Sequence, residues 1–339
     1  AKSLRLDFNE WIGSENPNLK TAVQSFDLVR ANMYPEGEKV LGKVSEQFGV
    51  RTSQLLLTNG TDEAFSNVYR TFLNPGDKVL IPDPGYTMMT FYTLLCQGTP
   101  VSWPLHLPTF DYDWNLARDF AKEGGKIVTL ARPNNPTGSG ACIDSVLEYA
   151  QSHPNQLVLV DEAYGDFAAD TLIPSALASE NLLVLRTFSK AWGLAGLRVG
   201  AVIGPEVLLR DLKKTASPYS VNAFALHVLE ALLPDKRWPA RATQLISESR
   251  ETLKRELNQR GMRTHFGGGN FFLMYLGKSL PAFLKAMEAR GVRLRDQSSK
   301  RGLENWVRVS IGAPEITKRF INLMDESLTE AAINPREVV

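Results

Sequence analysis

The sequence predicts an α/β protein with a mostly parallel sheet covered by helices on both faces, followed by a smaller α+β domain. Between residues 55 and 203, short apolar runs alternate with stretches of helical pattern, which is typical of such a sheet. Several runs are apolar throughout, as expected of strands buried on both faces. After residue 226 long helical stretches dominate, which favours a separate domain.

The first part of the chain divides into an N-terminal arm at 1–30 and a large domain at 31–225. The arm is polar and carries a short helical pattern near 19–29. In the large domain we expect strands at 55–57, 78–81, 126–130, 157–160, 182–185 and 199–203. Helices are expected at 38–48, from 61 to about 72, after the PDPGY turn at 82–86, and at 143–152.

The smaller domain is predicted at 226–339. Helices are expected from 207 onward and at 223–233, 240–260, 280–290 and 315–330, with strands at 271–275, 292–295 and 306–311. The triple glycine at 267–269 lacks the spacing of a dinucleotide or P-loop site. We interpret it as a flexible turn.

Composition excludes several classes of function. The net charge is +1, so the chain lacks the surplus of positive charge that is typical of proteins that bind nucleic acid or an anionic membrane. Cys96, Cys142 and the four scattered histidines form neither a disulfide framework nor a metal-ligand pattern. No apolar run is long enough to span a membrane, and the first residues hold no secretory apolar core. We therefore expect a cytoplasmic protein without a metal, nucleic-acid or membrane partner.

The stretch 182–200, LLVLRTFSKAWGLAGLRVG, carries the chemistry around which the chain is organised. Taken alone, Lys190 would be interpreted as a solvated surface lysine and Arg198 as an arginine at the rim of a surface site. However, Lys190 follows a buried strand among apolar and small residues, where desolvation favours a nucleophilic amine. Ser189 and Arg198 offer a hydroxyl and a fixed cation, which suit a phosphate. A lysine nucleophile beside a phosphate site suggests pyridoxal 5′-phosphate, whose aldehyde forms an imine with lysine.

A second candidate phosphate site lies where the strand at 55–57 meets the next helix. Gly60, Thr61 and Asp62 open that helix. The first amides of a helix have no partner within it and lie at the positive end of the macrodipole, so they readily bind phosphate. Taken by itself, this junction is equally a plain capped helix start.

Other polar side chains follow strand ends, where open α/β sheets bind ligands. Asp161 could keep a cofactor ring nitrogen protonated, while Asn135 and Tyr164 could hold its phenolic oxygen. Tyr86 could lie flat against the ring. Each residue also has an ordinary explanation: Asp161 as a helix cap, Asn135 as a turn residue and Tyr86 as a core aromatic. The occurrence of all these residues together in one chain argues against coincidence. Glu162 should point away from Asp161, because side chains alternate along an extended chain.

The motifs together resemble the fold type I pyridoxal-phosphate aminotransferases, above all the histidinol-phosphate aminotransferase group. The matching segments cover nearly the whole chain in the family's order: MYPEG (33–37), TNGTDEA (58–64), PDPGY (82–86), RPNNPTG (132–138), VDEAY (160–164), RTFSKAWGLAGLRVG (186–200), RLRDQ (293–297) and VRVSIG (307–312). The resemblance implies that Lys190 binds the cofactor as an imine and moves the proton. It also implies the contacts already named for Asp161, Asn135, Tyr164 and Tyr86, with the phosphate on Ser189, Arg198 and the amides of Thr61 and Asp62.

Further implications concern the substrate and the assembly. The resemblance implies a homodimer with shared sites, in which Tyr34 reaches the phosphate in the neighbouring subunit. Arg308 matches the arginine that binds the amino donor's carboxylate, and Arg295 matches one that helps bind the acceptor's anionic tail. The group usually carries an N-terminal Pro-Tyr lid, whereas this chain reads NEWIGSENPN there. We place Asn9 and Trp11 of that segment at the substrate.

The predicted reaction is a ping-pong transfer between a small amino donor and a keto acceptor, 2-oxoglutarate. Histidinol phosphate is the favoured donor, as in histidine biosynthesis. Two alternatives stay open within the family: an aromatic amino acid aminotransferase, and a threonine-phosphate decarboxylase, to which SPYSVNA (217–223) is similar. A pyridoxal-binding regulator would need a DNA-binding module for which the chain has no room. A nucleotide-binding module would need a glycine fingerprint that is absent.

Overall fold

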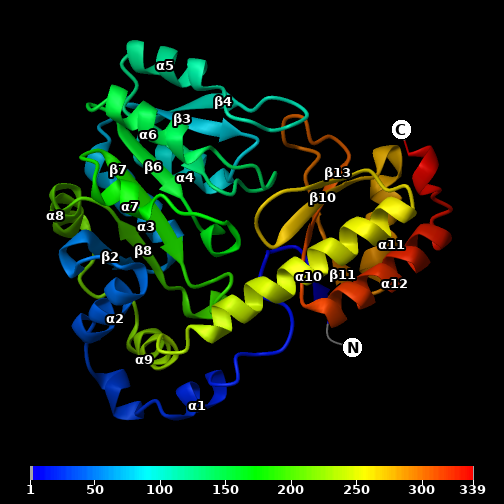
Figure 1. Cartoon of the computed structure of the whole chain (residues 1–339), viewed down its shortest axis with the longest axis horizontal. Helices are drawn as coiled ribbons and strands as arrows, with labels where there is room; N and C mark the ends of the chain where they lie inside the picture. The colour runs from blue at the N-terminus through cyan, green and yellow to red at the C-terminus, as the bar shows by residue number, and fades with distance from the viewer. Residues whose placement is uncertain (1–2, 339) are drawn as a thin grey trace.

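The computed structural model describes residues 3–338 and contains a large and a smaller sheet (Figure 1). The large sheet has seven strands in the order β2 (Leu55–Thr58), β8 (Gly200–Ile203), β7 (Leu182–Thr187), β6 (Leu157–Asp161), β5 (Ile127–Ala131), β3 (Lys78–Asp83) and β4 (Thr99–Pro104). Strands β4, β3, β5, β6 and β7 pair in parallel. The predicted parallel α/β sheet is thus confirmed.

Strand β8 is the exception, because it pairs antiparallel with both β7 and β2. Only the short 3₁₀ turn η4 (Ala195–Leu197) intervenes between β7 and β8. A parallel return needs a longer crossover, usually an α-helix. The turn that carries Lys190 therefore lies between two neighbouring strands of opposite direction.

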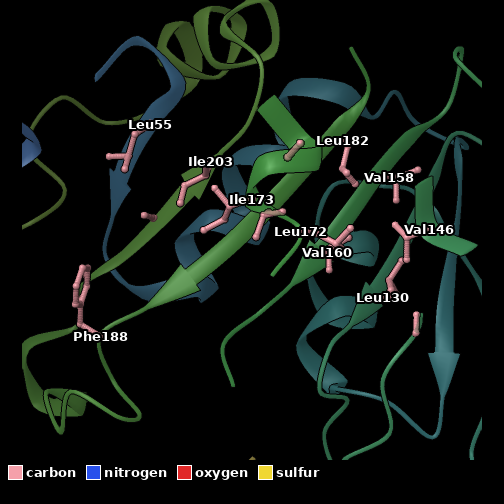
Figure 2. Close-up of a cluster of buried hydrophobic side chains, with 14 of the residues drawn as sticks. Leu55, Leu130, Val146, Val158, Val160, Leu172, Ile173, Leu182, Phe188 and Ile203 are labelled. Atoms are coloured by element: carbon pink, nitrogen blue, oxygen red, sulfur yellow. The ribbon is translucent and has the colours of Figure 1, made fainter. Parts of the chain in front are cut away.

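Helices cover both faces of this sheet, as predicted. Alternate side chains of each strand point to opposite faces. Val158 and Val160 belong to one core (Figure 2), and Leu157 and Leu159 belong to another. The first core includes residues of five helices: α2 (Glu38–Phe48), α5 (Trp114–Lys122), α6 (Ile143–Ser152), α7 (Ile173–Leu177) and α9 (Ala223–Leu232). The second core includes residues of three helices: α3 (Gly60–Phe72), α4 (Thr87–Leu95) and α8 (Glu206–Thr215). The strands are therefore buried on both sides, which explains their continuous apolar runs.

The smaller sheet is antiparallel. Its order is β12 (Arg295–Asp296), β13 (Trp306–Ser310), β10 (Phe271–Tyr275) and β9 (Thr264–Phe266). Helices α10 (Arg237–Gln259), α11 (Leu280–Ala289) and α12 (Pro314–Glu330) share a core with it. Figure 1 shows α10 extending from the region of the large sheet to the smaller one. Across residues 3–338, no helix is both long enough and apolar enough to cross a membrane.

Core membership shifts the expected domain limits. The predicted boundary at 225–226 falls within α9, whose Leu226 and Leu229 lie in the core of the large sheet. Ile246 of α10 lies in the other core. The N-terminal segment also joins the smaller part, because β1 (Leu4–Arg5) pairs with β11 (Val292–Arg293). The single helix expected near 19–29 is two pieces, α1 (Leu19–Gln24) and η1 (Leu28–Asn32).

Strand β4 (Thr99–Pro104) was not predicted from the sequence, and its prolines explain why. It lies at the edge of the sheet and contains two prolines, Pro100 and Pro104. Proline cannot donate to a ladder and therefore argues against a central strand, but an edge strand tolerates it.

Candidate active site

A cavity of about 430 Å³ lies beyond the carboxyl ends of β5, β6 and β7, where the two parts of the chain meet. Most of the predicted site residues line it: Thr61, Asp62, Tyr86, Asn135, Asp161, Tyr164, Ser189, Lys190, Arg198, Arg295 and Arg308. Gly60, Asn9, Trp11 and Tyr34 are not among its lining residues.

Lys190 follows β7 directly, and its amine is held by the N-terminal segment. Lys190 Nζ donates to the backbone oxygens of Asn9 at 3.1 Å and Phe8 at 3.3 Å. It also lies 5.3 Å from the centre of the Tyr164 ring. Two neutral carbonyls thus orient the amine at the cavity.

Asp161 ends β6 and is buried. Its Oδ1 accepts a hydrogen bond from the Ala163 N–H at 2.9 Å. Burial, assisted by the charges of Asp62 and Glu162, raises the pKa of Asp161 from 3.8 to about 7, against the lowering effects of the Ala163 bond and Lys190. A cationic ring nitrogen in the cavity would favour the ionised carboxylate again. The site therefore fits a protonated pyridine.

Asn9 positions the hydroxyl group of Tyr164 through a hydrogen bond. The Asn9 Nδ2 donates to Tyr164 Oη at 2.9 Å, so the phenol keeps its own proton free to donate. Asn9 is fully buried, and its N–H donates to Ser310 Oγ at 2.9 Å. Asn9, expected at the substrate, is not among the residues that line the cavity; it contacts Tyr164 and Lys190, which are.

Arg308 lies on β13 and reaches Asn135 across the cavity. Its Nη1 donates to Asn135 Oδ1 and its Nη2 to the Asp7 backbone oxygen, each at 2.5 Å. Its Nε is buried and has no hydrogen-bond partner among the described residues. Burial is the main cause that lowers the pKa of Arg308. Arg308 lines the cavity, and a guanidinium group suits a carboxylate.

The opposite end of the cavity offers an anion site at the start of α3. The N-cap residue Asn59 makes no side-chain capping bond to this helix, so the helix offers its first amides to a phosphate. Arg198 lies beside them: its Nη1 donates to Ser189 Oγ at 3.4 Å, and its Nη2 donates to Asp62 Oδ2 at 3.2 Å. Gly60 has a φ of +75°, and a Cβ there would lie 2.5 Å from Arg198 Nη2. The anion site at the start of α3 therefore requires glycine at position 60.

Tyr86 also lines the cavity. Its hydroxyl donates to Asp62 Oδ1 at 2.9 Å. Burial, the largest cause, and the Asp62 charge both raise the pKa of Tyr86. The ring therefore stays neutral at the cavity wall, where it could stack on a flat cofactor.

Glu162 points away from the cavity. It is fully buried and lies 3.2 Å from Arg186 and 3.6 Å from Arg132. It also accepts hydrogen bonds from Thr171 Oγ1 at 2.5 Å and from the Leu172 N–H at 2.8 Å. The alternation argument is confirmed, and Glu162 serves a buried ion-pair network rather than acid–base chemistry.

Two predicted residues lie apart from the cavity. Trp11 packs edge-on against Trp238, with ring centres 5.5 Å apart, and is not among the residues that line the cavity. Tyr34 is 77% exposed and stacks on Tyr219 with ring centres 4.6 Å apart. Its exposure leaves it able to reach a neighbouring subunit.

The triple glycine is a tightly packed turn, not a flexible one. The Gly268 N–H donates to the Gly138 backbone oxygen at 2.8 Å. A Cβ on Gly267 would lie 2.4 Å from the backbone of Gly138. Two glycine segments far apart in sequence thus meet next to the Asn135 loop, and this close approach could not be read from spacing alone.

Sequence reasoning missed Lys300, which also lines the cavity. Its Nζ donates to the Gly85 backbone oxygen at 2.5 Å and to Thr87 Oγ1 at 3.4 Å. Lys300 lies in a loop without regular structure, between the matched segments RLRDQ and VRVSIG. In the sequence, the signal that could have pointed to Lys300 is its position three residues after Gln297, which ends the matched segment RLRDQ.

The donor set as a whole fits pyridoxal 5′-phosphate. A glycine-lined anion site, a carboxylate of raised pKa and an oriented lysine amine face a single cavity. Each of the cofactor's phosphate, ring nitrogen and aldehyde therefore has a matching group.

Comparisons with known proteins agree with this assignment. The family described as aminotransferase class I and II matches residues 37–322. A histidinol-phosphate aminotransferase of Halorubrum lacusprofundi is 33% identical over 312 residues, covering 91% of this chain and 84% of the relative. The crystal structure of histidinol-phosphate aminotransferase from Sinorhizobium meliloti in complex with pyridoxal-5′-phosphate superposes with a TM-score of 0.88 at 23% identity, covering 97% of this chain and 92% of that one. L-threonine-O-3-phosphate decarboxylase from Porphyromonas gingivalis gives a TM-score of 0.82 at 22% identity, covering 96% and 99%.

Proposed function

Because the chain belongs to the class I and II aminotransferases and its cofactor is pyridoxal 5′-phosphate, we propose that it transfers an amino group from histidinol phosphate to 2-oxoglutarate, the activity EC 2.6.1.9. The observation that carries this proposal is the joint placement of Lys190, Asp161 and Arg308 at one cavity. The sequence relatives support the choice of donor.

When bound, the cofactor supplies an electron sink for the carbanion left at the substrate's α-carbon. Lys190 Nζ takes the α-proton and later returns a proton, as a general base and acid. Asp161 would keep the proton on the cofactor's ring nitrogen, and Tyr164 Oη would be available to donate to its phenolic oxygen. Arg308 binds an anionic group of the substrate and so orients the α-carbon toward Lys190.

We propose further that the enzyme works as a homodimer with shared sites. Large apolar side chains are exposed on η1 and α4: Leu28 is 79% exposed and Leu95 is 61% exposed. Surfaces of this kind mark protein–protein contacts when they are contiguous. Tyr34, next to η1, would extend into the partner's phosphate site. Light scattering of the purified protein should give twice the mass of the chain; a stable monomer with full activity would contradict the proposal.

A panel of substrates tests the reaction itself. L-histidinol phosphate, aromatic amino acids and O-phospho-L-threonine are each supplied to the holoenzyme with and without 2-oxoglutarate. We expect glutamate to form fastest with histidinol phosphate, and only when 2-oxoglutarate is present. Release of carbon dioxide from phosphothreonine without any acceptor would identify a decarboxylase instead. Faster turnover of aromatic amino acids would identify the other aminotransferase alternative.

A further inference from the structure

Three charged side chains form a row across neighbouring strand ends of the large sheet. The last ladder pairs of β5, β6 and β7 place Ala131, Asp161 and Leu185 side by side. The following residue of each strand is charged, and we call these three residues the charged row: Arg132, Glu162 and Arg186. Because side chains alternate along a strand, the charged row lies on the face opposite Asp161.

Glu162 joins the two arginines of the charged row. Its carboxylate accepts from Arg186 Nη1 at 3.2 Å and lies 3.6 Å from Arg132 Nη1. The side chain of Glu162 is 0% exposed, and those of Arg132 and Arg186 are 9% and 8% exposed. Apolar residues of similar volume often stabilise a fold as well as a buried ion pair does, or better. Stability therefore does not account for the row, which points to a role in the geometry of the neighbouring site.

Arg132 closes the loop that carries Asn135. Its Nε donates to the Ala141 backbone oxygen at 2.8 Å, across the base of the loop at 132–141. Its Nη2 donates to the carboxylate of Asp170. A planar guanidinium held at both of these points and facing Glu162 has little freedom to turn. A shift of Arg132 would therefore shift the loop and Asn135 with it.

Arg186 ties the segment of Lys190 to the turn that follows Tyr164. It lies on β7, four residues before Lys190, and its Nη2 donates to the carboxylate of Asp166 in η3 (Gly165–Phe167). A Cβ on Gly165 would lie 2.6 Å from Arg186 Nη1, so the guanidinium packs closely against this turn. Its two nitrogens thus hold the end of β7 and the turn beginning at Tyr164 in one arrangement.

We propose that Glu162 is a positioning residue, which holds the ends of β5, β6 and β7 in place through Arg132 and Arg186. The groups so placed are Asn135, Asp161 and Lys190. The inference rests on the proposed transamination, in which these groups act on the cofactor or the substrate. A displacement of about 1 Å at a reacting centre can cost roughly a hundredfold in rate. Glu162 does not line the cavity, so its effect reaches the reaction through its neighbours.

Two substitutions separate position from charge. Glu162→Gln keeps the shape of the side chain and removes its charge. Arg186→Lys keeps every charge, but one ammonium group does not reproduce the planar fork that meets both Glu162 and Asp166. Asp170→Asn is the matched control, because it also replaces an acid by its amide. Asp170 pairs with Arg132 at the edge of the same network and is 54% exposed.

The visible absorbance of the lysine-bound cofactor, titrated with pH at saturating cofactor, reports the surroundings of Lys190 without turnover. Glu162→Gln and Arg186→Lys should each shift the midpoint by at least about 0.5 pH unit, because the protonation of the lysine-bound nitrogen depends on its distance from neighbouring charges. Both should lower kcat at least about tenfold and leave the KM for 2-oxoglutarate within about twofold. Asp170→Asn should match the wild type in midpoint and kcat.

Urea unfolding shows whether each variant is folded under the assay conditions. Lower stability with a wild-type midpoint and kcat would give the charged row a structural role only and overturn the proposal. An effect of Glu162→Gln without one of Arg186→Lys would be due to charge and would overturn it too. If Glu162→Gln does not fold, Arg186→Lys decides alone. If the wild type transaminates no donor, the proposed function fails, while the absorbance titration still decides the positioning role.

Discussion

Replacing Asp161 by asparagine should stabilise the cofactor-free protein at alkaline pH and weaken its hold on the cofactor. Asparagine has nearly the same shape, and its Oδ1 can still accept from the Ala163 N–H. What it removes is a carboxylate that burial makes costly to ionise. The buried carboxylate therefore lowers the stability of the cofactor-free protein. Its negative charge would pair with the protonated ring nitrogen when the cofactor is bound.

The magnitude follows from the pKa of Asp161, which burial raises from 3.8 to about 7. Between these two values the folded protein binds more protons than the unfolded chain, so stability falls as the pH rises. A tenfold change in an ionisation constant corresponds to 1.36 kcal/mol, so the full penalty above pH 7 is roughly 4 kcal/mol. At pH 5 the same linkage gives only about 1.7 kcal/mol.

Urea unfolding of the cofactor-free wild type and Asp161→Asn, at pH 5 and at pH 8, measures this difference. We expect the variant to be more stable at both, with a gain at pH 8 more than twice that at pH 5. Cofactor affinity, from fluorescence titration, should fall by at least about tenfold. A variant equally stable at pH 8, or a gain independent of pH, would refute the claim that the buried carboxylate carries this cost.

Three other substitutions test separate parts of the site. Gly60→Ala should weaken cofactor affinity about tenfold without unfolding the protein, because alanine at positive φ costs about 1–2 kcal/mol and its Cβ meets Arg198; equilibrium dialysis measures this. Glu162→Ala should destabilise the fold by about 3–5 kcal/mol in urea, since it leaves buried arginines without their partner. Asn9→Ala should cost about 1–3 kcal/mol of stability and lower kcat, and Asn9→Asp should lower kcat as well, because a carboxylate cannot donate the hydrogen bond that Asn9 Nδ2 makes to Tyr164 Oη.

The sequence predicted the large sheet well because its signals are local. Runs such as the one ending at Asp161 are apolar throughout, and the polar residue after each run lies at the shared edge of the sheet. Parallel strands bring such ends together whatever the loops do. This is why Asn135, Asp161 and Lys190 could be placed in one cavity before the fold was known.

What escaped prediction depends on contacts between distant segments. The role of Asn9 requires the N-terminal segment to cross behind Tyr164, and Lys300 is brought to the cavity by a loop of the smaller domain. Trp11 follows Asn9 by two residues, packs on Trp238 and is not among the residues that line the cavity. Periodicity and spacing carry no information about which of two neighbouring polar or aromatic side chains turns inward.

The chemistry proposed for Lys190 can be tested at the level of a single covalent bond. Borohydride reduction of the holoenzyme followed by peptide mass spectrometry should find the cofactor fixed to Lys190, and Lys190→Ala should show neither the adduct nor the visible absorbance of the lysine-bound cofactor. Modification of Lys300, the other lysine that lines the cavity, or an unchanged spectrum in Lys190→Ala, would contradict the account.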